Sequence, residues 1–98
     1  MQSTQFYKLM LNLSNMYYVY LLQSETNPKK IYIGYTAFLD AQLKEHNTAE
    51  KGFTSRFQPW KIIYYEAYDN RAIAMEREFQ FKRHGNVMAR LKSRLHLL

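Results

Sequence analysis

The sequence contains no cysteine, and only three glycines and two prolines occur among its 98 residues. A chain without cysteine forms neither a disulfide framework nor a thiolate metal site. This absence fits a protein of the reducing cytoplasm. No run of residues is long and apolar enough to span a membrane, so we expect a cytoplasmic protein with no membrane partner.

Aromatic and basic residues, by contrast, are abundant. Hydrophobic residues make up 47% of the sequence and aromatic residues 16%, which is typical of a globular protein. Fourteen lysines and arginines against eight aspartates and glutamates leave a net charge of +6. A basic surface favours polyanions, above all nucleic acid, although many small proteins are mildly basic without binding one.

Apolar and aromatic runs predict three strands and three helices in the order β-β-α-β-α-α. The expected strands are 16–23, 31–35 and 60–68, and the expected helices are 37–47, 71–83 and 87–95. Both faces of the first strand are apolar or aromatic, so we expect it to be central. The order predicts an α+β fold, in which helices pack on a three-stranded antiparallel sheet.

The chain length suits one domain, which we expect at residues 16–98. Residues 1–15 are weakly patterned and lack the apolar core of a signal peptide, so we interpret them as an N-terminal extension of unknown role. At the helix ends, Thr36 is a candidate N-cap for the first helix. Asp69 or Asn70 is the candidate N-cap of the second helix, and Gly85 is expected to end it.

Two tyrosines are candidates for chemistry because they lie on strands joined by a hairpin. Cross-strand neighbours on one face are ~5 Å apart, so the phenols of Tyr20 and Tyr32 can meet at one point. The alternative is that both are ordinary sheet aromatics. Between them and the first helix, Gly34 interrupts the second strand, as glycine does where a backbone must be approached closely.

A histidine and a carboxylate are the other candidates. His46 follows Gln42 by about one turn on the first helix. Glu78 lies in an apolar stripe with Ala74 and Phe81, where a carboxylate is costly unless it binds something. A salt bridge from Glu78 to a nearby lysine or arginine is the alternative. No histidine pair has the spacing of zinc ligands.

In combination these segments resemble the GIY-YIG nuclease family, in its small stand-alone form. The resemblance covers about residues 16–95 and rests on five segments in the expected order. These are Tyr18-Val19-Tyr20, Tyr32-Ile33-Gly34, the helix from Leu39 to Asn47, the strand 59–66 and the helix segment Ala74 to Glu78.

The resemblance implies an endonuclease that hydrolyses DNA phosphodiester bonds with one divalent ion, Mg²⁺ or Mn²⁺, held by Glu78. It implies that Tyr20 is the general base or orients the attacking water, and that Tyr32 assists at the nucleophile or the phosphate. His46 would tune the tyrosines or relay a proton. Such a reaction needs an activated water and charge neutralisation on the phosphate, and a carboxylate-held divalent ion supplies the second.

The chain departs from the family pattern at Gln42, where the family has an arginine that binds the phosphate. A neutral amide lacks the permanent charge and bidentate grip of a guanidinium. We therefore expect activity to be reduced or abolished in this chain. Alternatively, the chain is a non-catalytic DNA- or RNA-binding module on a nuclease-derived scaffold.

Basic residues on the middle loop and the last two helices are the expected nucleic-acid contacts. They are Lys51, Arg56, Arg77, Arg83 and Arg90. Phe53, beside these cations, suits stacking on single-stranded bases, but a place in the core is an equal alternative. The sequence shows no appended specificity domain, so recognition is expected from the domain itself or from a protein partner.

Overall fold

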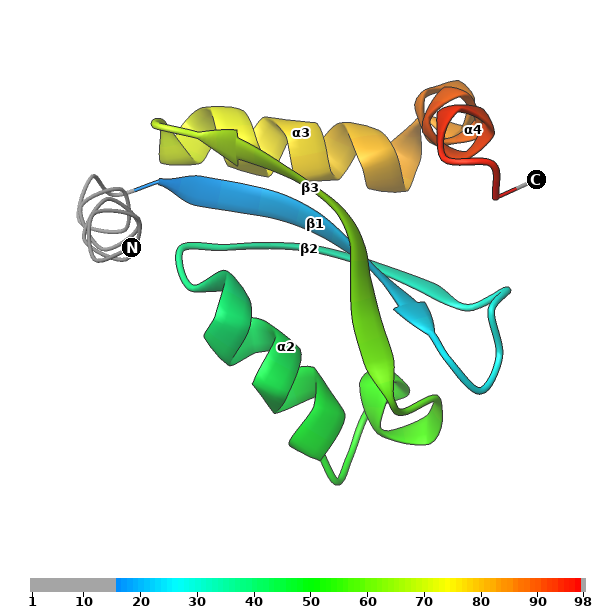
Figure 1. The fold of residues 1–98 in the computed structure, drawn as a ribbon. Helices are drawn as coiled ribbons and strands as arrows, with labels where there is room; N and C mark the ends of the chain where they lie inside the picture. The colour runs from blue at the N-terminus through cyan, green and yellow to red at the C-terminus, as the bar shows by residue number, and fades with distance from the viewer. Residues whose placement is uncertain (1–15, 98) are drawn as a thin grey trace, which may run out of the picture.

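The computed structural model describes residues 16–97, and the predicted extension, 1–15, lies outside them. Strands β1 (Tyr17–Ser24), β2 (Ile31–Thr36) and β3 (Trp60–Tyr68) form one antiparallel sheet in the order β2-β1-β3. The helices are α2 (Leu39–Thr48), the short 3₁₀ helix η1 (Phe53–Arg56), α3 (Arg71–Arg83) and α4 (Gly85–Arg94). The predicted α+β fold and its element order are confirmed, with η1 added in the expected loop (Figure 1).

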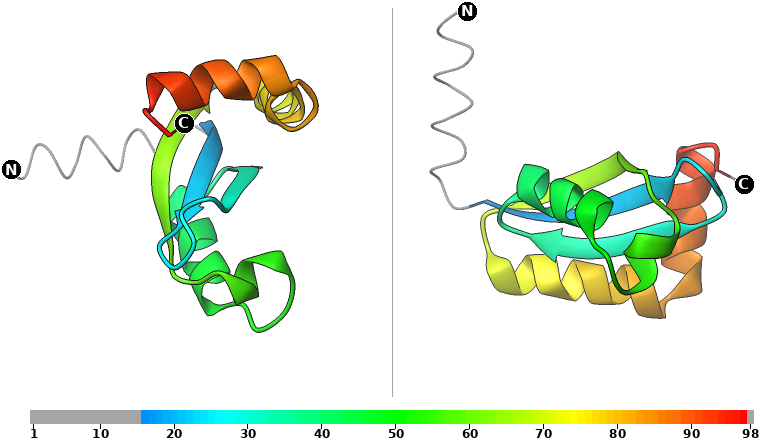
Figure 2. Two further views of the ribbon diagram at one scale, coloured as in Figure 1. Left: turned by 90° about the vertical axis from the view of Figure 1, so that its right-hand side faces the viewer. Right: turned by 90° about the horizontal axis from the view of Figure 1, so that it is seen from below.

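The sheet separates two helical layers, with α2 on one face and α3 and α4 on the other (Figures 1 and 2). β1 is central, as predicted, and is buried on both faces. Val19 and Leu21 face α3 and α4, whereas Tyr20 and Leu22 pack with Trp60 on the side of α2. Among residues 16–97, none of the helices combines the length and apolar character needed to cross a bilayer.

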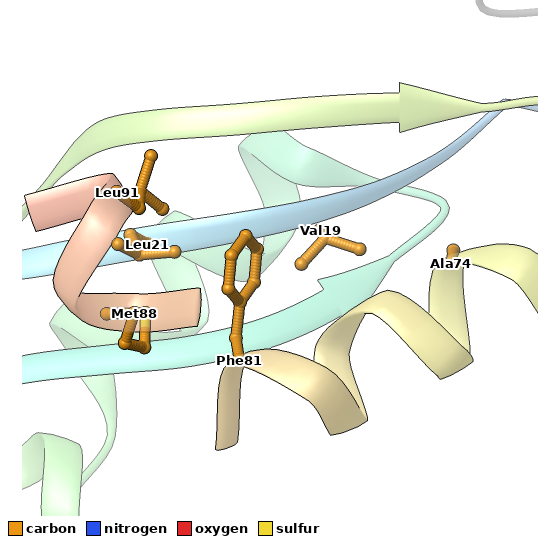
Figure 3. Close-up of a cluster of buried hydrophobic side chains, with 6 residues drawn as sticks. All are labelled: Val19, Leu21, Ala74, Phe81, Met88 and Leu91. Atoms are coloured by element: carbon orange, nitrogen blue, oxygen red, sulfur yellow. The ribbon is translucent and has the colours of Figure 1, made fainter. Parts of the chain in front are cut away.

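The larger core lies between the sheet and the two C-terminal helices (Figure 3). Its buried members are Val19, Leu21, Ala74, Phe81, Met88 and Leu91. Fully burying a large apolar side chain contributes roughly 1.5–3 kcal/mol. This core therefore fixes α3 against the sheet, and with it the position of Glu78.

The helix boundaries differ from prediction where local capping decides them. Thr36 Oγ1 accepts a hydrogen bond of 3.0 Å from the Phe38 N–H, which shapes the turn, and α2 begins only at Leu39. Asn70 caps α3 as predicted, because its side chain accepts from the Ile73 N–H at 3.1 Å. The expectation for Gly85 was wrong: α3 ends at Arg83 with His84 as its C-cap, and Gly85 is the first residue of α4.

Candidate active site

The ring of Tyr20 occupies the space where Gly34 has no side chain. The two residues are directly opposite each other on β1 and β2. A Cβ added to Gly34 would lie 2.5 Å from Tyr20 Oη and 2.7 Å from Cζ. Gly34 therefore lets the Tyr20 ring cross over β2, the edge strand. The close approach predicted at this glycine exists, but it comes from Tyr20.

His46 is the point at which the two tyrosines meet. Tyr20 Oη and His46 Nε2 share a hydrogen bond of 3.0 Å. Tyr32 is opposite Leu22 instead of Tyr20, so the two tyrosines are diagonal neighbours with ring centroids 6.3 Å apart. The Tyr32 ring lies closer to His46, at 4.5 Å between centroids.

Contacts at the end of α2 hold His46 in place. The Gln58 side-chain amide donates to the His46 carbonyl at 2.9 Å. The neighbouring Asn47 donates through Nδ2 to the Trp60 carbonyl at 3.0 Å, and its Oδ1 accepts from the Trp60 N–H. These bonds tie α2 to the start of β3, so the imidazole, only 9% exposed, faces the tyrosines.

The protonation of the cluster follows from its burial. Burial raises the pKa of Tyr20, and the nearby Tyr32, Glu78 and Glu45 raise it further. Tyr20 is therefore a neutral phenol at neutral pH. Burial lowers the pKa of His46 below its usual 6.5, against a smaller opposing effect of Glu45. The imidazole is therefore neutral and able to accept a proton at pH 7.

Glu78 lies on α3, in the opposite layer, within electrostatic range of this cluster. Its position on α3 is close enough for its charge to raise the pKa of Tyr20. Its side chain is 20% exposed, and Oε2 lies 3.2 Å from Lys82 Nζ, one turn later. The salt bridge considered from sequence thus exists. Sequence reasoning did not single out Lys82, although its i,i+4 spacing was a usable signal.

A divalent ion fits Glu78 only as a partly hydrated ion. Among the described residues, 16–97, no three histidine, cysteine or acidic side chains gather into a ligand set. Mg²⁺ is commonly held by one or two carboxylates, with waters and substrate phosphates completing its shell. The single carboxylate of Glu78 matches this mode, provided that it releases Lys82.

The remaining predicted site residues differ in their availability. Gln42, half-buried one turn before His46, donates weakly to Glu45 Oε2 at 3.5 Å. Arg77 is engaged by Glu66 through two bonds of 2.8 and 3.0 Å, so its charge is already paired, and its contact with nucleic acid stays a prediction. The other four predicted nucleic-acid contacts are exposed: Lys51, Arg56, Arg83 and Arg90.

Phe53 resolves the choice that the sequence left open. Its side chain is 40% exposed, so it is not a core residue. Its ring stacks beside Tyr32 with centroids 6.5 Å apart, and the ring of Phe57 lies 5.2 Å away. One face of Phe53 therefore extends the aromatic row that begins at Tyr20.

Comparison with known proteins gives matches to one family. The model of the GIY-YIG catalytic domain matches residues 16–90. A UPF0213 protein of Pediococcus pentosaceus is 37% identical over 71 residues, which cover 71% of this chain and 73% of that protein. A UPF0213 protein of Haloquadratum walsbyi is 30% identical over 71 residues, covering 71% of this chain and 78% of its own. A third, from Streptococcus pyogenes, is 36% identical over 67 residues, covering 67% and 71%.

Proposed function

This chain belongs to the GIY-YIG family, and we propose that it is a metal-dependent DNA endonuclease whose activity is reduced or abolished by Gln42. One observation carries the proposal. Tyr20, Tyr32 and His46 form a connected cluster, and the Glu78 carboxylate acts on it from α3. A proton acceptor, an orienting phenol and a potential metal ligand are therefore brought together from three elements.

In the proposed reaction, Tyr20 orients a water molecule and His46 receives the proton. The water oxygen forms the new bond to phosphorus, and one bridging P–O bond breaks, its electron pair leaving on the ester oxygen, which takes a proton from solvent. The phenol takes the proton of the water while its own hydroxyl proton passes to His46 Nε2, 3.0 Å away. A neutral, raised-pKa phenol suits this relay better than it suits the role of a free phenolate base.

Glu78 is the residue that would hold the divalent ion, which when bound neutralises charge on the phosphate and the leaving oxygen. Gln42 presents an amide where the family has an arginine. Losing one transition-state contact of this kind costs roughly 10²–10³ in rate. We therefore expect slow cleavage by the chain as it stands.

Single-stranded or structured DNA is the proposed substrate. The exposed face of Phe53 offers a base-stacking surface beside Tyr32, and Lys51 and Arg56 are exposed on the same loop. Stacking of a base on an aromatic side chain is worth ~1–3 kcal/mol. A duplex, whose bases are already stacked, gains nothing from this surface. The absence of cysteine supports a cytoplasmic location.

The test is cleavage of labelled single-stranded, duplex and branched DNA with Mg²⁺ or Mn²⁺, using a chelator and Glu78→Ala as controls. We expect slow, metal-dependent cutting that Glu78→Ala removes. Phe53→Ala should slow cutting of single strands by about tenfold and leave duplex cutting unchanged. Cutting that survives both the chelator and Glu78→Ala would contradict the proposal.

A non-catalytic binding module is the second candidate. It is favoured by the neutral side chain of Gln42 and by the pairing of Glu78 with Lys82. This alternative predicts that DNA or RNA is bound but not cut, even by Gln42→Arg with metal. The salt dependence of affinity for DNA and for RNA then shows which polymer makes more phosphate contacts.

A further inference from the structure

A basic pocket lies between α3 and α4, and its lining includes none of Tyr20, Tyr32 and His46. Its volume is about 230 Å³. Its lining residues are Arg77, Val87, Arg90, Leu91 and Arg94. Three of the five are arginines, and none is a candidate catalytic residue. The pocket therefore needs an explanation of its own.

The pocket carries more positive charge than its surroundings neutralise. Glu66 neutralises Arg77, and hydrogen bonds to Glu66 and Gln80 use three of the five N–H groups of that guanidinium. Two N–H groups remain. Arg90 and Arg94 are exposed one turn apart on α4, and neither forms an ion pair within the part of the chain described. Like charges at this spacing repel each other, so an anion between them would relieve the repulsion.

We infer that this pocket binds a phosphate group of the DNA backbone, as a second contact separate from the catalytic cluster. Arginine is suited to phosphate because its planar fork donates two parallel hydrogen bonds. Val87 and Leu91 add an apolar wall against which the adjoining sugar can pack. The inference rests on the proposed function only in taking DNA as the ligand.

The pocket and His46 lie on opposite faces of the sheet. α4 packs on the face of Val19 and Leu21, whereas His46 on α2 lies on the other (Figure 2). The domain measures 38 × 30 × 24 Å. At ~3.4 Å per nucleotide, the rise of one strand in B-DNA, a stacked strand needs on the order of ten nucleotides to span the longest dimension. A long flexible strand can therefore occupy both contacts, and a very short one cannot.

The experiment measures the affinity of single-stranded oligonucleotides of increasing length by fluorescence anisotropy, in chelator so that no cutting occurs. The test variant is Arg90→Gln/Arg94→Gln. The matched control, Lys29→Gln/Lys61→Gln, removes the same charge from exposed residues outside the pocket. Thermal unfolding of each variant establishes that it is folded.

We expect wild-type affinity to rise steeply beyond about ten nucleotides, and this rise to disappear in the arginine variant. For long strands, that variant should bind about tenfold more weakly, since hydrogen bonds to charged groups are the strong ones. Its slope of log K against log salt should be lower by about 1.4, at ~0.7 per lost contact with a single strand. Arg90→Lys/Arg94→Lys keeps the charge and should lie between wild type and the glutamine variant.

The inference would be overturned if Arg90→Gln/Arg94→Gln weakened binding no more than the control Lys29→Gln/Lys61→Gln does. It would also be overturned if the affinity of Arg90→Gln/Arg94→Gln rose with strand length as that of wild type does. The nuclease proposal is judged separately, from cleavage with metal. Arginine-dependent binding without any cutting supports the pocket and counts against the nuclease. Cutting together with binding that does not depend on Arg90 and Arg94 supports the nuclease proposal and rules out the pocket as a DNA contact.

Discussion

Glu66 on β3 and Glu78 on α3 are two partly buried carboxylates in very different surroundings. Glu66 accepts hydrogen bonds of 2.5 Å from both Tyr64 and Tyr68, and two more from Arg77. A carboxylate has about four lone-pair sites, so Glu66 is saturated. Glu78 makes one contact, to Lys82 at 3.2 Å. The first carboxylate stabilises the fold, and the second retains oxygen sites for a ligand.

The pKa values agree with this contrast. Burial raises the pKa of Glu66, but the hydrogen bonds from Arg77, Tyr64 and Tyr68 outweigh it and lower the pKa to about 2. The charge of Glu78, by comparison, acts on another group, because it raises the pKa of Tyr20. A buried acidic residue is therefore a site candidate when its own hydrogen-bonding capacity is unfilled.

The sharpest test of the contrast is Glu78→Gln. It should lower the cleavage rate by roughly 10²–10³, the typical loss for one transition-state contact. Its free energy of unfolding should change by less than ~0.5 kcal/mol, because a lone pair with an exposed lysine is worth little. Single-turnover cleavage and urea unfolding measure the two quantities. A large loss of stability would show that Glu78 is structural like Glu66.

Glu66→Gln should show the opposite pattern. Removing one partner of a buried pair costs ~3–5 kcal/mol. Because the Arg77 side chain is 32% exposed, we expect about 2 kcal/mol, with metal-dependent cleavage retained below the unfolding transition. Urea unfolding at pH 7 measures the loss. Full stability together with lost cleavage would reverse the roles of the two glutamates.

The same network predicts a pH window for stability. Between the usual pKa of 4.5 and the folded value of about 2, the unfolded chain binds a proton at Glu66 that the folded chain does not. Stability is therefore lost as pH falls through this window and is present above it. Unfolding of wild type and Glu66→Gln from pH 6 to pH 2 should converge at the acidic end. Parallel curves would contradict the assignment to Glu66.

Gln42→Arg tests the candidate active site, to which Glu78 belongs, by a gain of activity. A guanidinium at this position should raise cleavage by at least about tenfold at saturating metal, a cautious share of such a contact's usual worth. Gln42→Lys is the control, since it restores charge without the bidentate fork. Equal rates for wild type and Gln42→Arg would show that residue 42 does not face the phosphate.

The smallest expected effect is in the pH profile of cleavage. Because the pKa of His46 lies below 6.5, the imidazole remains a proton acceptor at neutral pH, and the rate should fall only below pH 6.5. The decrease in cleavage rate at acidic pH is best measured with Gln42→Arg, because its expected rate is higher. A rate that keeps rising through pH 9 would assign the base to a group other than His46.

Local signals predicted most of the fold. β3 and α3 have the predicted bounds, since strand composition and the Asn70 cap act over a few residues. The start of α2 did not follow its local signal, because Thr36 bonds to Phe38 in the turn instead of to the helix. The 3₁₀ helix of the middle loop, η1, had no periodic sequence pattern from which it could be predicted.

The residues of the candidate site could be chosen from the sequence, but their arrangement could not be predicted from it. Tyr20, Tyr32 and His46 do lie together, yet their diagonal pairing depends on the strand register, which places Gly34 opposite Tyr20. Glu66 and Arg77 are 11 positions apart on different elements, and no short-range pattern joins them. Long-range partners therefore decided which charged residues remained available.

The need for glycine at position 34 limits how this protein can change by mutation. The absence of a side chain at Gly34 makes room for the candidate active site, because a methyl group there would collide with the Tyr20 hydroxyl. A single-base codon change from glycine to alanine would displace that hydroxyl while leaving α4 and its arginines untouched. The proposed nuclease is thus one nucleotide away from a protein that would hold DNA without cutting it.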